Sequence, residues 1–406
     1  MTLGAANSRI ENALNQLENM AAHATPIGLP EYQQRVQKAQ ALMQQQGVSA
    51  VYLNAGTNLE YFTGLKWYPS ERLVGALILP EGPVTLVAPA FEEGSLTQAM
   101  VLPMECVLWE EHESPTELMI NWLNQQFGTD YILAIDESTS YAIVSKIQQV
   151  KPAAQLIDAV SITAQCRMHK SAAELHLIQT AMNMTLEVHK ATASILHEGI
   201  KASEVKAFIH EAHKRVGSSG SFFCIVLFGE ATAYPHGVSY DPVLAKNDWV
   251  LIDTGCKLHG YLSDITRTYA FGEATEAQRQ FWEYEHKLQQ TAFKAAKLGA
   301  TCGSVDDAVR EKLKALNLEA DYRLPGVPHR TGHGIGMDIH EWPYLVGNDQ
   351  TKLAPGMCFS NEPMVINPGQ FGVRLEDHFY MTENGPKWFT EPSRSLDDPF
   401  NMRLAD

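Results

Sequence analysis

The sequence has few cysteines and comparatively little positive charge. Its six cysteines, in 406 residues, stand singly and without CxxC spacing. This pattern predicts free thiols and argues against a disulfide framework or a cysteine-rich zinc site. Its 31 lysines and arginines are outnumbered by 47 aspartates and glutamates, which gives a net charge of −16. That acidity opposes binding to nucleic acid or to an anionic membrane by bulk electrostatics.

Long apolar runs are also missing from the sequence. The longest, such as LVGALIL at 73–79, are the size of a strand and fall well short of the roughly 18 residues that a membrane span needs. The first twenty residues lack the basic start and apolar core of a secretory signal. We therefore expect no membrane partner and a cytoplasmic location.

The chain is long enough for about two or three domains. Residues 8–22 carry apolar side chains at helical spacing, which predicts a short amphipathic helix within an N-terminal extension, 1–25. This helix could pack on its own subunit or serve as a contact arm in a dimer, and the sequence leaves both possibilities open.

Residues 26–165 alternate between helical and strand patterns, which predicts a small α/β domain. A helix is expected at 31–46, and the apolar segments 73–79 and 84–88 flank a turn and read as a hairpin. The segment SPTE at 114–117 is a capping box that opens a further helix. We find no constellation of catalytic residues in this domain.

Residues 166–406 read as an α+β domain. Two long helical runs, at 171–199 and 203–216, are followed by strands, by two further helices and then by strands punctuated with glycine and proline. Four histidines lie on the first two helical runs, and two of them have a spacing that metal ligands can use. We interpret all four as surface histidines: His189, His197, His210 and His213.

Five residues of this second domain form a candidate metal site. Four are carboxylates and one is an imidazole, each in a distinctive short motif: Asp253 (IDTG), Asp264 (SDIT), His333 (GHGIG), Glu362 (NEP) and Glu376 (RLED). Such a set can hold two divalent ions, which together activate water and polarise a carbonyl. We expect Mn²⁺, with Co²⁺, Zn²⁺ or Fe²⁺ as alternatives, because these ions accept mixed oxygen and nitrogen ligands.

Taken singly, these residues also have ordinary structural explanations. Asp253 could cap a turn, and Asp264 could pair with Arg267. Arg374 and Glu376 are two residues apart in a strand pattern and should share a face, so the arginine could orient that carboxylate.

The order of the motifs resembles that of the pita-bread metallopeptidases, the superfamily of methionine aminopeptidase, aminopeptidase P, prolidase and creatinase. The resemblance is strong over 170–390. It extends to the N-terminal domain through segments such as NLEYFTGL and to the junction CRMHKSAAEL at 166–175. It implies an α+β pita-bread catalytic domain, 166–406, preceded by a smaller α/β domain of the creatinase/prolidase type.

The resemblance also implies a role for each candidate ligand. Asp253 and Asp264 would bind one ion, with Asp264 bridging, while His333 and Glu362 would bind the other and Glu376 would bridge both.

The resemblance implies further site residues that bind no metal. His236 in AYPHG and His340 in DIHE would hydrogen-bond the substrate and the tetrahedral intermediate. Arg374 completes the expected substrate-binding set, and Glu362 would act with the two histidines in catalysis by moving a proton to the leaving nitrogen. His329 is expected near the site, with its role open.

Two departures from the family pattern leave the substrate open. Met364 and Val365 follow Glu362-Pro363 where many members have Gly-Ile-Tyr, and His378 stands where a small residue is common.

The function that follows is that of a dinuclear metal-dependent exopeptidase that hydrolyses Xaa-Pro bonds, as a dipeptidase or an aminopeptidase. The resemblance further implies a homodimer in which residues 26–165 of one chain approach the metal site of the other. One alternative is an amide hydrolase of the ectoine hydrolase or creatinase type, although creatinase lacks the full ligand set. Another is a non-catalytic binding module, but such modules have lost ligands that are intact in this sequence.

Overall fold

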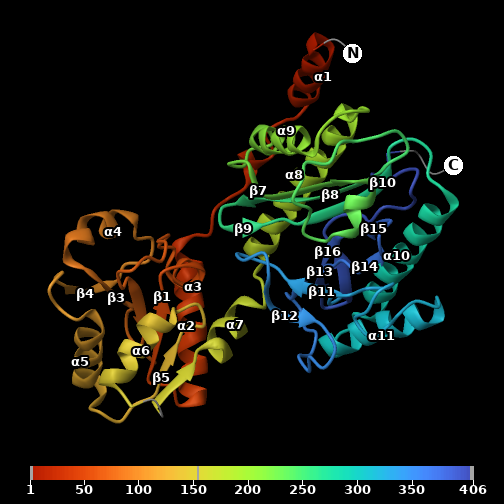
Figure 1. Ribbon diagram of the computed structural model, residues 1–406. Coiled ribbons are helices and arrows are strands. Elements are labelled where there is room, and N and C mark those ends of the chain that lie inside the picture. The colour runs from red at the N-terminus through yellow and green to blue at the C-terminus, as the bar shows by residue number, and fades with distance from the viewer. Residues whose placement is uncertain (1–2, 153–154, 403–406) are drawn as a thin grey trace. The chain divides into compact units, whose positions relative to one another are not determined.

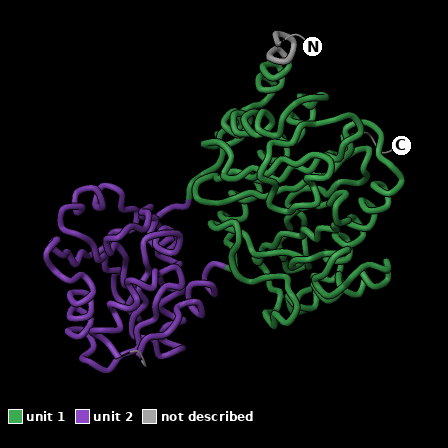
Figure 2. Tube along the Cα trace, in the orientation of Figure 1, with its two compact units in different colours: residues 1–26, 168–406 green, residues 27–167 purple. Residues whose placement is uncertain are grey.

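The computed structural model describes residues 3–152 and 155–402, which divide into two compact units (Figure 2). Residues 27–167 form unit 2, and residues 1–26 together with 168–406 form unit 1. The N-terminal helix α1 (Leu3–Asn15) packs against α8 (Ala172–Ile195) and α9 (Ala202–Arg215) of unit 1. The N-terminal segment is therefore part of the unit that carries the candidate metal ligands.

Unit 2 is built on one mixed six-stranded sheet. Its strands are β1 (Ala50–Asn54), β2 (Gly75–Ile78), β3 (Thr85–Pro89), β4 (Glu105–Trp109), β5 (Leu133–Ile135) and β6 (Leu156–Asp158). They lie in the order β4-β3-β2-β1-β5-β6, and β2 and β3 form the predicted antiparallel hairpin. The helices of the unit are α2 (Leu29–Gln46), α3 (Thr57–Thr63), α4 (Glu93–Ala99), α5 (Pro115–Phe127), α6 (Tyr141–Val150) and α7 (Val160–Arg167).

Local sequence signals set the ends of two helices in unit 2. Helix α2 stops at Gly47, whose φ of 68° is the left-handed conformation that glycine adopts without a steric penalty. Helix α5 begins after Ser114, whose side chain accepts a hydrogen bond from the main-chain N–H of Glu117. Pro115 occupies the first helical position, where its missing N–H costs nothing. Both helices thus confirm predictions made from short-range sequence alone.

The described residues of unit 1 form three sheets. The first is formed by β7 (Ser221–Phe228), β8 (Trp249–Leu258), β9 (Tyr261–Leu262) and β10 (Ile265–Ala270). The second is formed by β11 (Gly332–Gly334), β12 (Glu341–Leu345), β13 (Cys358–Asn361), β16 (Asp377–Thr382) and β17 (Gly385–Trp388). The third is the hairpin of β14 (Met364–Asn367) and β15 (Phe371–Arg374).

Two pairs of helices cover the sheets of unit 1 (Figure 1). Helices α8 and α9 pack against β7, β8 and β9, and α10 (Glu276–Ala295) and α11 (Cys302–Ala315) pack against strands of the other two sheets. Each pair buries its apolar face against strands, which is the layered arrangement of an α+β fold. The predicted fold class of both parts of the chain is confirmed.

A tight hairpin and one interstrand bridge bring the candidate ligands together. His259 and Gly260, with φ of 47° and 95°, form the two-residue turn between β8 and β9. The chain then returns as β10, which pairs antiparallel with β8 so that Thr266 lies opposite Asp253. Thr266 also bridges to Glu376, which directly precedes β16, so residues 110 positions apart in sequence meet at one place.

The histidines of α8 and α9 correct a prediction. His189 and His213 are 1% and 0% exposed, so the interpretation as surface residues is wrong for both. The ring of His213 lies between hydroxyl oxygens, with Nδ1 3.0 Å from Ser221 Oγ and Nε2 3.1 Å from Thr185 Oγ1. His189 Nε2 donates to the carbonyl of Ile265 at 2.9 Å. These partners let the helices carry histidine on the faces that they turn toward the sheet.

The cysteine prediction is confirmed, since all six cysteines are unpaired. Within the described ranges of the chain, no helix combines the length and the apolar character needed to cross a bilayer.

Candidate metal centre and active site

Four buried side chains of unit 1 each place one potential ligand atom within 4.8 Å of the other three: Asp264, His333, Glu376 and His378. Three of them belong to the set predicted from the sequence, and His378 does not. Two come from the sheet of β11, β13 and β16, and Asp264 precedes β10 of the first sheet. The cluster therefore lies where two sheets of unit 1 meet.

His333 presents one ring nitrogen to the carboxylates. Its Nδ1 lies 2.9 Å from the carbonyl oxygen of Gly334, which can only accept, so Nδ1 carries the proton. The other ring nitrogen, Nε2, faces Glu362 Oε1 at 3.0 Å and Asp264 Oδ2 at 3.8 Å. A ring nitrogen that faces two carboxylates is placed to bind a cation together with them, which is the arrangement of a metal ligand.

The glycines beside His333 are required by close approach of neighbouring strands. A Cβ on Gly332 would lie 2.1 Å from the carbonyl oxygen of Ser360, and one on Gly334 would lie 2.3 Å from that of Glu341. The GHG segment is therefore held tightly between β12 and β13. This packing fixes the position of the His333 ring.

Three of the predicted carboxylate ligands have a buried oxygen without a hydrogen-bond partner: Asp253 Oδ1, Asp264 Oδ1 and Glu376 Oε1. Burial, together with repulsion from the neighbouring carboxylates, holds the pKa of both Asp264 and Glu376 well above the usual range. Unpartnered carboxylate oxygens next to an imidazole nitrogen suit divalent metal ions, whose charge would compensate this repulsion. The donor set thus fits the metal ions that the sequence predicts.

Arg374 contacts Asp253 directly and Glu376 through one intermediate. Its Nη2 lies 2.5 Å from Asp253 Oδ2, and its Nε donates to Thr266 Oγ1 at 3.0 Å. The same hydroxyl donates to Glu376 Oε2 at 2.7 Å. The arginine therefore orients two candidate ligands, although we expected only a contact with Glu376.

The ordinary alternatives for the two aspartates do not hold in the structure. Asp253 lies inside β8, which continues to Leu258, so it does not cap a turn. Arg267 forms its ion pair with Asp377 instead of Asp264, with Nη2 2.7 Å from Oδ1. Asp264 thus belongs to the cluster, and Asp253 lies outside the four-residue cluster, paired with Arg374.

Glu362 is the most accessible of the candidate carboxylates. Its side chain is 14% exposed, whereas that of Glu376 is 2% exposed. Burial raises the pKa of Glu362, but the hydrogen bond and charge of His333 outweigh it and bring the pKa below the usual range. An ionised carboxylate that reaches solvent beside the cluster can accept a proton from water.

The two remaining predicted histidines lie outside the cluster and reach solvent, although the ring of His340 is partly covered by its neighbours. The ring centroid of His340 lies 4.3 Å from that of His333, and partial burial, with the charge of His333, lowers the pKa of His340 to about 4. His236 follows the short helix η4 (Gly229–Ala233) and lines a pocket of about 440 Å³ together with Cys224 and Tyr240. Its charge also contributes to lowering the pKa of His340, so the two histidines are electrostatic neighbours.

His329 is partly buried near these groups. Its Nδ1 donates to the carbonyl of Arg330 at 2.7 Å, and burial lowers its pKa while the charge of Glu362 opposes that shift.

His378 is the residue of the cluster that sequence reasoning did not identify as a possible ligand. A signal for it exists, because side chains two apart in a strand share a face, and His378 is two residues after Glu376. The rule that puts Arg374 and Glu376 on one face also puts His378 there, at the next alternate position.

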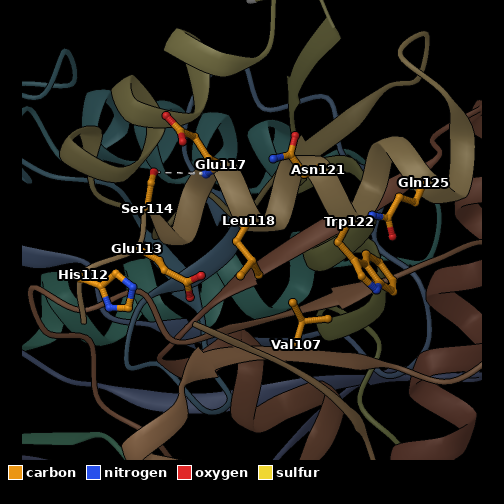
Figure 3. A pocket seen from close by; sticks show the side chains of 9 residues that line it. All are labelled: Val107, His112, Glu113, Ser114, Glu117, Leu118, Asn121, Trp122 and Gln125. Carbon is orange, nitrogen blue, oxygen red and sulfur yellow. Dashed lines mark hydrogen bonds between the residues drawn. The ribbon is translucent and has the colours of Figure 1, made fainter. Parts of the chain in front are cut away.

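Unit 2 has a pocket of about 570 Å³ beside α5 (Figure 3). Its ionisable side chains are His112, Glu113 and Glu117. Ser114, which caps α5, lies among them, and Glu113 accepts a hydrogen bond from the main chain of Glu110. Among the residues that the structure describes, these groups do not form a metal-ligating cluster. The start of α5 and its capping residue account for the polar groups that line this pocket.

Comparison with known proteins agrees with the geometry. The profile of metallopeptidase family M24 matches residues 176–383, and that of the creatinase/prolidase N-terminal domain matches residues 35–169. A putative dipeptidase, YkvY from Bacillus subtilis, is 32% identical over 89% of this chain and 99% of its own length. The Xaa-Pro dipeptidase of Pyrococcus furiosus is 30% identical over the same shares of the two chains.

A solved structure shows the same likeness. The dipeptidase PepE from Mycobacterium ulcerans superimposes with a TM-score of 0.85 at 30% identity, covering 92% of this chain and 99% of that one. With both units matched and the ligand motifs inside the matched region, the chain belongs to metallopeptidase family M24 and is an enzyme that hydrolyses peptides.

Proposed function

We propose that the enzyme is a dinuclear metal-dependent exopeptidase that hydrolyses Xaa-Pro bonds, as a dipeptidase or an aminopeptidase. The observation that carries the metal part is the set of buried carboxylate oxygens without hydrogen-bond partners around His333. The preference for Xaa-Pro bonds is supported by relatives such as the Xaa-Pro dipeptidase of Pyrococcus furiosus. A homodimer belongs to the same proposal.

The predicted ligands divide between two ion positions. Asp253 and Asp264 would hold one ion, His333 and Glu362 the other, and Glu376 would bridge. The carboxylate-rich first position suits Mn²⁺, which prefers oxygen ligands. When bound, the ions supply an activated water and polarise the scissile carbonyl.

The chain's own residues would position the substrate and move protons. Glu362, ionised and partly exposed, would accept a proton from the attacking water and pass it to the leaving nitrogen. His340 is neutral at pH 7 because its pKa is lowered to about 4, so it can donate a hydrogen bond to the developing oxyanion without carrying charge. His236 would act with it from the loop after η4. Arg374 holds Asp253 in place.

The test is a substrate panel on metal-loaded protein. We expect hydrolysis of Ala-Pro and Met-Pro after addition of Mn²⁺ or Co²⁺, little hydrolysis of Ala-Ala, and two ions per chain by elemental analysis. The variant Asp264→Asn, which removes a bridging charge, should lose both activity and bound metal.

Three results would overturn parts of this proposal. Equal rates on Ala-Ala and Ala-Pro would exclude Xaa-Pro selectivity. Ring-opening hydrolysis of ectoine, a cyclic amidine, without hydrolysis of peptides would favour an ectoine hydrolase type of activity. A single ion per chain at full activity would exclude a dinuclear centre.

A further inference from the structure

His378 is completely buried, yet neither nitrogen of its ring makes a hydrogen bond. It lies in β16, is 0% exposed, and both Nδ1 and Nε2 lack a partner. The main chain of Asp264 lies close to the ring, but neither nitrogen is in hydrogen-bond geometry with it. Nearly all buried polar groups in proteins are hydrogen-bonded, so an exception of this kind calls for a ligand.

A carboxylate oxygen close to the ring is itself without a partner. His378 Nε2 lies 4.0 Å from Glu376 Oε1, which is buried and makes no hydrogen bond. That separation is too long for a hydrogen bond. It is close to twice the bond of about 2.1 Å between a divalent metal ion and a nitrogen or oxygen ligand. Two such atoms can therefore bind the same ion from different sides.

The ring also stands beside the other candidate ligands. Its centroid lies 5.8 Å from that of His333, and it belongs to the group whose ligand atoms lie within 4.8 Å of one another. Two imidazoles and two carboxylates thus surround one small volume: those of His333, His378, Asp264 and Glu376.

The strand register prevents His378 from turning away from this volume. The preceding residue, Asp377, faces the opposite side of β16, where it accepts hydrogen bonds from Arg267, Thr390 and Gln289. In the neighbouring strand, Ser360 lies opposite His378. Because side chains alternate along a strand, anchoring Asp377 on one side fixes His378 on the other.

We propose that His378 is an additional metal ligand, which binds the same ion as His333. This inference rests on the proposed metal-dependent function. It assigns a sixth ligand to the centre and gives one of the two ion positions two nitrogens. Imidazole ligands suit Zn²⁺, Co²⁺ and Fe²⁺ better than Mn²⁺, so this position should select those ions while the carboxylate-rich position accepts Mn²⁺.

The deciding measurement is the number of imidazoles around the metal. Metal-free protein is loaded with one equivalent of Co²⁺, and X-ray absorption counts the nitrogen ligands from histidine. We expect two in the wild type and one in each of two variants, His378→Asn and His378→Leu. The matched control is His340→Ala, because His340 lies beside His333 but is proposed to bind no metal. This variant should keep two imidazole ligands on the metal.

Affinity gives a second readout that does not depend on activity. Competition with a chelator should show Zn²⁺ and Co²⁺ binding weakened by more than about 100-fold in both His378 variants, beyond the range for residues that only support a ligand. Mn²⁺ binding should change much less. Thermal unfolding identifies any variant that fails to fold. Even without variants, the number of imidazoles around the metal in the wild type shows whether a second histidine binds it.

The outcomes separate this inference from the proposed function. One imidazole in wild-type protein that binds two ions and hydrolyses Xaa-Pro peptides would overturn the role of His378 alone. Wild-type protein that binds no divalent ion would overturn the proposed function as well. Two imidazoles in the wild type that persist in both variants would also exclude His378 as a ligand.

Discussion

Arg374 and Asp253, which are 121 residues apart in sequence, form a buried ion pair with Nη2 2.5 Å from Oδ2. Burial raises the pKa of Asp253, and the charge of Arg374 opposes that rise. The other oxygen, Oδ1, makes no hydrogen bond. One oxygen is thus held by the arginine while the other remains available to a metal ion, which is how a supporting residue orients a ligand.

Replacing this arginine should weaken metal binding without unfolding the protein. Lysine keeps the charge, but as a single point donor it cannot bond Asp253 and Thr266 together as the guanidinium does. We expect Arg374→Lys to lower the affinity for divalent ions by about 10- to 100-fold, measured by chelator competition. Arg279→Lys, at an exposed arginine paired with Asp397, is the control and should show no change. Equal affinities in both variants would exclude this role for Arg374.

Variants of Glu362 and of His340 should distinguish a loss of metal binding from a loss of substrate binding. Glu362→Ala should abolish turnover and reduce metal occupancy, because it removes both a ligand and the proposed proton carrier. His340→Ala should keep the metal and lower kcat by roughly 100-fold, the effect of one lost hydrogen-bond donor to the transition state. The same result is expected for His236→Ala. Metal analysis together with steady-state kinetics checks both, and loss of an ion from His340→Ala would show that His340 is a ligand.

The buried histidine of α9 should make stability depend on pH. Burial lowers the pKa of His213 to about 3, against an ordinary value of 6.5. Between these values the unfolded chain binds a proton that the folded chain does not. The free energy of unfolding should therefore fall as pH decreases from 6.5, by up to about 1.4 kcal/mol per pH unit.

Urea unfolding at pH 7, 6 and 5 measures that slope. His213→Gln should reduce it, since glutamine can replace a hydrogen bond of the ring but does not titrate. His210→Gln, on the exposed face of the same helix, should leave the slope unchanged. A wild-type slope that persists in His213→Gln would mean that other groups cause it.

The assembly prediction concerns unit 2, in which we identify no catalytic residues. We expect sedimentation of the full chain to show a homodimer at micromolar concentration. A chain of residues 166–406 alone should keep the metal ligands but lose either solubility or selectivity for substrate length, since apolar surface would be exposed. A strict monomer with unchanged selectivity in the shortened chain would contradict this prediction.

Sequence by itself determined the features that depend on near neighbours. Gly47 ends α2 and Ser114 begins α5 because capping involves only a few consecutive residues. The hairpin of β2 and β3 follows from two apolar segments around a turn. The order of the Asp, His and Glu motifs also indicated the family and its fold, since each motif is short and the motifs recur in one sequence order.

Only the tertiary structure decided which residues contact the buried face of each helix and strand. The alternation of β16 places His378 on the face of Glu376, but only the packing of two sheets shows that this face holds unpartnered ligand atoms. Helical spacing likewise could not show that His213 finds hydroxyl partners from α8 and β7, which make its burial possible. Contacts between distant segments depend on how sheets and helices pack, and local propensity contains no information about that packing.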